Sequence, residues 1–291
     1  MSFFRSRWVQ APEHVTELGP TALPEGFRSG ATHAGIKVEG LDVGLMVSDR
    51  GQTVSAARFT SNALVAAPVS VSREADLEAL RAVAVNSGNA NVSDGERGMD
   101  TARAGQAAAA EALDLEPAAV AVASTGVIGR ELPRQKLVAG LRHAAGALGP
   151  NAEAFTESIL TTDNGPKSAC LEVELPSGKV RLAAQAKGGG MISPAFATML
   201  CFVQTDAALS PETIDLLTGV TVKRSFERIS VDGQLSTNDC VIAMANGAAG
   251  VEVAPESADE LALRRGPGRA AAPAGDRDRG ATARAPSAWA A

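Results

Sequence analysis

Short apolar segments dominate this chain, and most of them stop at a glycine or a polar residue. They are rich in valine and alanine, as strands buried on both faces of a sheet usually are. The clearest of them are residues 41–48 (LDVGLMVS), 82–86, 118–124 and 240–244. A buried strand needs an apolar layer on each side, so these segments predict a layered fold.

Alanine-rich stretches between these strands predict helices. Asp100 is expected to cap a helix that runs to about Leu113, because TARAGQAAAAEAL is strongly helix-forming. Ser210 followed by Pro211 has the pattern of an N-cap and a first helical residue. Further elements are expected as helices over 132–147, 152–160 and 211–226 and as strands over 198–204 and 228–231. Strands and helices mixed without strict alternation or internal repeat favour an α/β or α+β fold.

Composition excludes several classes of function. The net charge is -6 and aromatic residues make up 3% of the chain, so a nucleic-acid partner is not expected. No segment reaches the roughly 18 apolar residues of a membrane span, and the N-terminus lacks a signal-peptide pattern. The histidines and cysteines do not have metal-ligand spacing, and no metal is predicted. These observations predict a cytoplasmic protein without a membrane partner.

Residues 264–291 differ from the rest of the sequence. They are almost wholly alanine, arginine, glycine and proline, with no leucine, isoleucine, valine, phenylalanine or methionine. Such a segment cannot bury enough apolar surface to offset the entropy lost on ordering. It is expected to be either a disordered tail or the product of a shift in reading frame, and the abrupt change of composition favours the frame shift.

The most informative segment is KGGGMISPAFATML, residues 187–200. Three consecutive glycines allow a close approach of the backbone to a ligand or a strand. Lys187 precedes the glycines, which disfavours a phosphate-binding loop. Thr198 opens an apolar strand, and cleavage after Ala197 would give it a free α-amino group. That amine has an ordinary pKa near neutrality and could activate the threonine hydroxyl as a nucleophile. A purely structural threonine at a strand start remains the commoner case.

Four other loops follow apolar elements: NSGNAN (86–91), ASTGVIG (123–129), TTDNGPK (161–167) and SVDGQLSTND (230–239). In the second, the Thr125 hydroxyl and the Gly126 amide could form an oxyanion hole. Each loop taken alone could be an ordinary polar turn, and for ASTGVIG such a turn is the better interpretation.

Taken together and in order, these five loops resemble the family of bifunctional acetyltransferases of arginine biosynthesis, the glutamate N-acetyltransferases or ornithine acetyltransferases. EGFRSGATHAGIK and RFTSNALVAAPV are similar to the family's N-terminal segments, and the resemblance runs from about Pro24 to about Val253. Ala195, Phe196 and Glu227 depart from the usual residues. Family members also continue further, with a binding glutamate for which this sequence has no match, so the resemblance is to a C-terminally truncated or frame-shifted member.

The resemblance implies an αββα-type sandwich similar to N-terminal-nucleophile enzymes. It implies self-cleavage at Ala197–Thr198 into an α chain, residues 1–197, and a β chain that begins at Thr198. Residues 198–263 belong to the β chain, and the atypical residues 264–291 follow them. These chains are expected to form a heterotetramer. Thr198 would be the nucleophile, Thr125 and Gly126 the oxyanion hole, and Thr161, Lys187 and Thr198 the substrate contacts.

The implied reaction moves an acetyl group from N2-acetyl-L-ornithine to L-glutamate through an acetyl-threonine intermediate. No bound cofactor is implied, although acetyl-CoA serves some members as a co-substrate. Two alternatives stay open from the sequence. One is an inactive truncated chain. The other is an N-terminal-nucleophile amidase or peptidase, in which water replaces glutamate.

Overall fold

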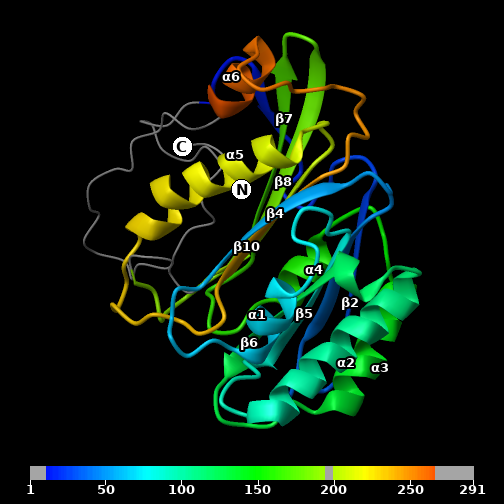
Figure 1. Ribbon diagram of the computed structural model, residues 1–291, viewed down its shortest axis with the longest axis vertical. Helices are drawn as coiled ribbons and strands as arrows, with labels where there is room; N and C mark the ends of the chain where they lie inside the picture. The colour runs from blue at the N-terminus through cyan, green and yellow to red at the C-terminus, as the bar shows by residue number, and fades with distance from the viewer. Residues whose placement is uncertain (1–10, 194–198, 266–291) are drawn as a thin grey trace.

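The computed structural model describes residues 11–193 and 199–265 (Figure 1). The strands are β1 (Val15–Glu17), β2 (Phe27–Thr32), β3 (Val43–Ser48), β4 (Val54–Phe59), β5 (Ala82–Asn89), β6 (Val120–Val127), β7 (Lys167–Leu175), β8 (Gly178–Lys187), β9 (Leu200–Thr205) and β10 (Cys240–Ala245). The helices are α1 (Ala67–Arg73), α2 (Gly95–Leu113), α3 (Arg134–Gly146), α4 (Glu153–Ser158), α5 (Pro211–Arg224) and α6 (Ala258–Arg265).

The described strands form two mixed sheets. The six-stranded sheet has the order β1-β7-β8-β9-β10-β4, with β9 and β10 parallel and the other neighbours antiparallel. The four-stranded sheet has the order β2-β3-β5-β6, in which β5 and β6 are parallel. The two sheets pack face to face. Helices α5 and α6 pack on the outer face of the larger sheet, and α1, α2 and α3 cover that of the smaller (Figure 1). This arrangement confirms the predicted αββα layers.

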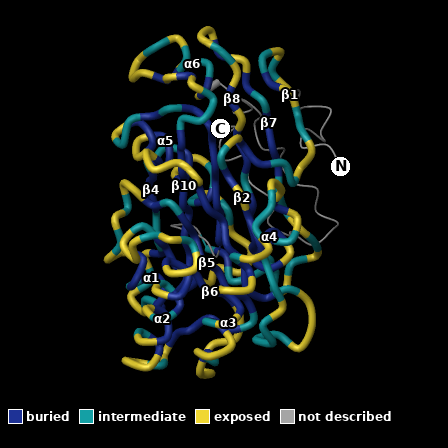
Figure 2. The backbone as a smooth tube through the Cα atoms, turned by 90° about the vertical axis from the view of Figure 1, so that its right-hand side faces the viewer, coloured by how far each residue is buried: buried dark blue, intermediate teal, exposed yellow. Residues whose placement is uncertain are grey.

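Strands β9 and β10 are interior strands of the larger sheet, with a neighbouring strand on each side, and both have continuous apolar sequences. Phe202 and Ile242 face the space between the sheets, whereas Val203 and Ala243 face the layer that contains α5. Every residue of both strands is buried, as the dark tube of the central strands in Figure 2 shows. A strand with apolar layers on both sides needs no polar alternation, and for that reason these two strands were predictable.

The core between the sheets is closed by α4. Phe155 of this helix meets Phe202 edge to face, with ring centroids 5.5 Å apart. The helix approaches β3 so closely that a Cβ atom at Gly44 would lie 2.3 Å from Ser158 Oγ. Gly44 therefore permits the contact that brings the loop after α4 to the ends of the strands.

Two expected local features are wrong. Asp100 lies inside α2, which begins at Gly95. This glycine-containing first turn has weak helix propensity, but Asn91 Nδ2 supports it by donating to Gly98 O at 3.0 Å. Residues 228–231 do not form a strand. The Val231 amide donates instead to Ile192 O at 3.0 Å, and the amides of the next two residues donate to the same oxygen. The predicted Ser210 cap is confirmed, since its hydroxyl accepts from Thr213 N at 3.2 Å.

The predicted boundary between Ala197 and Thr198 lies outside the described residues. On either side of it, β8 and β9 are antiparallel neighbours, with Lys187 opposite Leu200. The two predicted chains would therefore share one sheet and one core. Of residues 264–291, which form the atypical segment, only the first two are described, at the end of α6.

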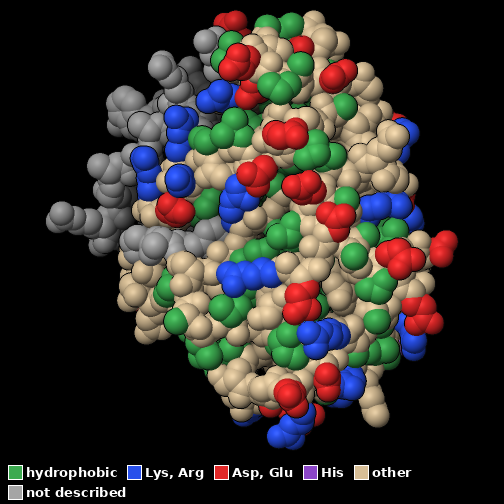
Figure 3. All heavy atoms as spheres, viewed as in Figure 1, with side chains coloured by type: hydrophobic (Ala, Val, Ile, Leu, Met, Phe, Trp, Pro, Cys, Tyr) green, Lys and Arg blue, Asp and Glu red, His purple; other side chains and the backbone are tan. Residues whose placement is uncertain are grey.

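Acidic and basic side chains are mixed over the face of the molecule shown in Figure 3. The surface also carries exposed ion pairs, for example Arg142–Glu111 at 2.9 Å. Surface pairs of this kind add little to stability, so the apolar layers hold the fold. None of the helices in the described ranges combines the length and apolar character needed to cross a bilayer.

Replacing Phe202 with alanine tests the role of the core between the sheets. The fully buried ring makes the contact with Phe155, so its loss should lower the free energy of unfolding in urea by about 3–5 kcal/mol. Leu216→Ala is the matched control, because Leu216 on α5 is 55% exposed. Equal, small losses in both variants would show that this contact does not support the fold.

Candidate active site

Lys187 is the last residue of β8, and its buried side chain joins the two sheets. Its Nζ donates to Thr161 Oγ1 at 2.6 Å and to Thr125 Oγ1 at 3.0 Å. Thr125 belongs to β6 of the smaller sheet, and Thr161 follows α4. Three residues that the sequence analysis singled out are therefore in direct contact, although they lie far apart along the chain.

Gly126 directly follows Thr125 and has φ of +135°, a conformation that favours glycine. A Cβ atom here would lie 2.3 Å from the carbonyl carbon of Gly88, so no side chain fits. The pairing of β5 with β6 is irregular at this point, with a bulge beside Gly88. Because the Thr125 hydroxyl oxygen accepts from Lys187, its own hydrogen is left to donate elsewhere. The hydroxyl and the Gly126 amide thus have the chemistry of an oxyanion hole.

Asp163 is a fully buried carboxylate that the sequence analysis did not assign. Lys167 Nζ donates to it, Gly188 N donates to Oδ1 at 2.8 Å, and Lys187 Nζ lies 4.0 Å from Oδ2. Burial alone would raise the pKa of Asp163, but these hydrogen bonds and positive charges bring the pKa below its usual range. In turn, burial lowers the pKa of Lys187, and the charge of Asp163 opposes that change.

The glycine loop after Lys187 is held at both ends. Asp163 binds the Gly188 amide at one end, as described above. At the other, Asp232 accepts from Met191 N at 2.6 Å and from Ile192 N at 2.9 Å. A Cβ atom at Gly189 would lie 3.0 Å from Thr162 O, so this glycine lets the loop pack against the TTDNGPK segment.

Asp239 fixes the start of β9. Its Oδ1 accepts from Met199 N at 2.9 Å, while its buried Oδ2 has no hydrogen-bond partner among the described residues. Burial raises the pKa of Asp239 to about 8, although the Met199 amide and Lys187 act in the opposite direction. Ala197 and Thr198, the predicted cleavage site and nucleophile, lie outside the described residues. Met199 is covalently bonded to Thr198, so Asp239 anchors the chain one residue after the predicted nucleophile.

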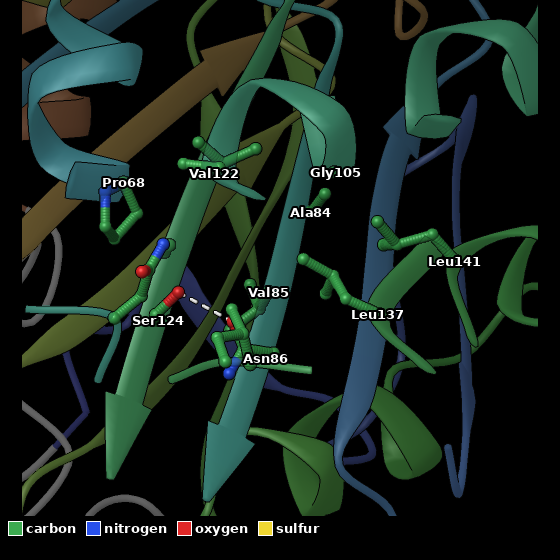
Figure 4. A pocket seen from close by; sticks show the side chains of 13 residues that line it. Pro68, Ala84, Val85, Asn86, Gly105, Val122, Ser124, Leu137 and Leu141 are labelled. Atoms are coloured by element: carbon green, nitrogen blue, oxygen red, sulfur yellow. Dashed lines mark hydrogen bonds between the residues drawn. The ribbon is translucent and has the colours of Figure 1, made fainter. Parts of the chain in front are cut away.

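Buried amides connect the remaining loops. Ser124 Oγ donates to Asn86 Oδ1 at 2.6 Å, the dashed contact in Figure 4, and so links the ends of β5 and β6. Asn238 Nδ2 donates to Ser124 O at 3.0 Å and to Ala90 O at 2.6 Å. The cavity drawn in Figure 4 lies beside this link and is lined mainly by apolar side chains of β5, β6, α2 and α3. It belongs to the packed helix layer rather than to the cluster around Lys187.

All five loops identified in the sequence therefore meet at one end of the two sheets. The sequence analysis missed the individual roles of Asp163, Asp232, Asn238 and Asp239. Each of these residues lies in a loop that had been singled out, and an acidic or amide residue beside glycines was the available signal. Within residues 11–193 and 199–265, no three His, Cys, Asp or Glu side chains are grouped to hold a metal ion.

Comparison with known proteins found similar chains. The arginine biosynthesis bifunctional protein ArgJ of Listeria monocytogenes serotype 4b is 43% identical over 233 residues, which are 79% of this chain and 58% of that protein. The protein of the same name from Thermus thermophilus is 47% identical over 233 residues, which are 78% of this chain and 59% of the Thermus protein. This chain thus spans less than two thirds of the length of these relatives.

Two crystal structures share the fold. ArgJ from Bacillus halodurans is 33% identical with a TM-score of 0.55, and the match covers 64% of this chain and 98% of that one. Ornithine acetyltransferase from Mycobacterium tuberculosis, determined in complex with ornithine, is 32% identical with a TM-score of 0.56, covering 64% of this chain and 100% of that one. The model of the ArgJ family matches residues 28–265, which include all five loops. By sequence and by fold, this chain belongs to the ArgJ family.

Proposed function

We propose that this protein is an acetyltransferase that moves the acetyl group of N2-acetyl-L-ornithine to L-glutamate in arginine biosynthesis. The observation that carries the proposal is the contact of Lys187 with both Thr125 and Thr161. It puts a candidate oxyanion hole beside a buried cation, near the anchored start of β9. The names of the relatives, bifunctional ArgJ and ornithine acetyltransferase, support the same activity.

In this proposal the chain first cleaves itself. The Thr198 hydroxyl attacks the Ala197 carbonyl, and water hydrolyses the resulting ester, which leaves Thr198 with a free α-amino group. Burial raises the pKa of the Cys201 thiol to about 12, so this neighbouring cysteine stays protonated and is a poor rival nucleophile. The two chains stay together through β8 and β9 and form a heterotetramer in the cytoplasm.

Acetyl transfer then uses the new amine as the base. It accepts the proton of the Thr198 hydroxyl as the oxygen attacks the acetyl carbonyl of N-acetylornithine. The Thr125 hydroxyl and the Gly126 amide stabilise the oxyanion, and ornithine leaves with the proton. The amine of L-glutamate attacks the acetyl-threonine, and the bond between the acetyl carbon and the Thr198 oxygen breaks. The proton lost by the glutamate amine returns to that oxygen through the Thr198 α-amino group, and N-acetylglutamate leaves. Lys187 contacts a substrate carboxylate, and no metal or bound cofactor takes part.

Self-cleavage is the first test. Purified protein should contain a fragment whose N-terminal sequence is TMLCF, because Thr198 supplies the attacking hydroxyl. Thr198→Ala should abolish that fragment, and Thr198→Ser should retain it because serine keeps the hydroxyl. Intact-mass spectrometry and Edman sequencing report both results. A folded wild-type chain that remains whole would refute the proposed activation step.

The oxyanion role of Thr125 predicts a loss of rate. Thr125→Ala should lower kcat by about 10²–10³ with little change in KM, as expected for the removal of one donor to the oxyanion. Thr125→Ser keeps the hydroxyl and should remain within a few fold of the wild type. An alanine variant with normal kcat would remove Thr125 from the reaction.

The pair Lys187 and Asp163 predicts a pH effect. Lys187 binds a carboxylate only while it is protonated, and Asp163 opposes the fall in its pKa that burial causes. In Asp163→Asn this opposition is lost, so the pKa of Lys187 falls further and KM should begin to rise at a lower pH than in the wild type. Asp232→Asn is the control, because Asp232 holds the same loop without appearing among the charges that shift Lys187. KM profiles that coincide for wild type and Asp163→Asn would contradict this role.

A further inference from the structure

We propose that Lys37 is a second cation of the substrate site and binds the α-carboxylate that N-acetylornithine and glutamate share. This inference rests on the proposed function. Lys37 belongs to the HAGIK segment between β2 and β3, which lies outside the five loops of the candidate site. Three observations place Lys37 at the substrate site: the fixed backbone of its loop, the path of its side chain and the position of its ammonium group.

The backbone at Lys37 is fixed by a buried carboxylate. Asp42 Oδ1 accepts from Ala34 N at 2.6 Å, and its Oδ2 accepts from Ile36 N at 2.6 Å and from Lys37 N at 2.9 Å. The Asp42 side chain has 0% exposure. A carboxylate that holds three backbone amides gives the loop one conformation, so the direction of the Lys37 side chain is set before substrate arrives.

The Lys37 side chain passes over the end of β5. A Cβ atom at Gly88 would lie 2.6 Å from Lys37 Cγ, so the lysine occupies the space that a larger residue would take. Gly88 pairs with Gly126, the candidate oxyanion donor. The aliphatic part of Lys37 therefore lies one strand away from the point where the acetyl carbonyl is expected to bind.

The ammonium group of Lys37 binds Leu160, the residue before Thr161, which accepts a hydrogen bond from Lys187. Its Nζ donates to Leu160 O at 3.3 Å, whereas Lys187 Nζ donates to Thr161 Oγ1 at 2.6 Å. Leu160 O is the one hydrogen-bond acceptor of Lys37 Nζ within the described residues, which leaves donors for a ligand. Burial lowers the pKa of Lys37, Asp42 and Glu157 oppose that change, and the charge of Lys37 in turn lowers the pKa of Lys187.

The ammonium groups of Lys37 and Lys187 bind to consecutive residues, Leu160 and Thr161, and their like charges repel each other. An anion between them would relieve that repulsion. In an N-acetyl amino acid the α-carboxylate is only a few covalent bonds from the acetyl carbonyl. With that carbonyl at Thr125 and Gly126, we expect the carboxylate to come within reach of the two lysines that bind Leu160 and Thr161. The side chains of ornithine and glutamate differ in charge, so a site common to both substrates must recognise the α-carboxylate.

Equilibrium binding to the full 291-residue chain carrying Thr198→Ala, which prevents turnover, tests the proposal. Isothermal titration calorimetry measures Kd for N2-acetyl-L-ornithine and for its α-carboxamide, which lacks the carboxylate charge. Adding Lys37→Met should weaken binding of the acid by about 10- to 100-fold, as for a lost charged hydrogen bond. Lys37→Arg should recover most of the affinity. The carboxamide should bind weakly to the parent chain, which carries Thr198→Ala alone. Adding Lys37→Met should not weaken that binding further.

Lys136→Met is the matched control. Lys136 lies on α3, is exposed, and donates to Gly35 O of the same loop at 2.7 Å, so its removal disturbs the loop without removing the proposed cation. An unchanged Kd in Lys37→Met, an equal loss for the carboxamide, or an equal loss in Lys136→Met would overturn the proposal. So would a parent chain that does not bind the acid. Self-cleavage of the wild type is scored separately, so failure of the proposed function is distinguishable from failure of this inference.

Discussion

A buried ammonium group has to be surrounded by acceptors and negative charge, and in this protein the ammonium of Lys187 imposes that requirement on both sheets. The larger sheet supplies Lys187, the smaller one supplies Thr125, and the segment after α4 supplies Thr161 and Asp163. Removing any one of these acceptors would leave a cation partly uncompensated in a region of low dielectric constant, which is costly. The polar connection between the sheets at this end and the proposed chemistry therefore depend on the same side chain.

Much of the fold was predictable from the sequence because it depends on local patterns. The apolar segments that became β9 and β10 are buried on both faces, and the Ser210 cap is a local signal for α5. The β7–β8 hairpin was missed because residues such as Glu172 and Arg181 interrupt its apolar pattern on the exposed face. The start of α2 was hidden by glycines in its first turn, which packing around Asn91 overrides.

The site was predictable as a set of loops but not as a set of contacts. Thr125, Thr161 and Lys187 were chosen from the sequence, yet only the packing of two sheets brings them together. Asp163 meets Gly188, and Asp239 meets Met199, across 25 and 40 residues of chain. No short-range pattern encodes such pairings. Likewise, the sequence singled out Gly126 as a possible oxyanion donor, but its φ of +135° depends on the irregular pairing with β5 and is evident only in the structure.

The proposed chemistry requires that this end of the two sheets deliver an acetyl group to Thr198. The most direct measurement is tandem mass spectrometry of the cleaved protein after rapid mixing with N2-acetyl-L-ornithine and acid quenching. The account predicts one acetyl group on the hydroxyl of the N-terminal Thr198, which disappears when L-glutamate is added before the quench. An acetyl group on another residue, or a cleaved and folded protein that never becomes acetylated, would contradict it.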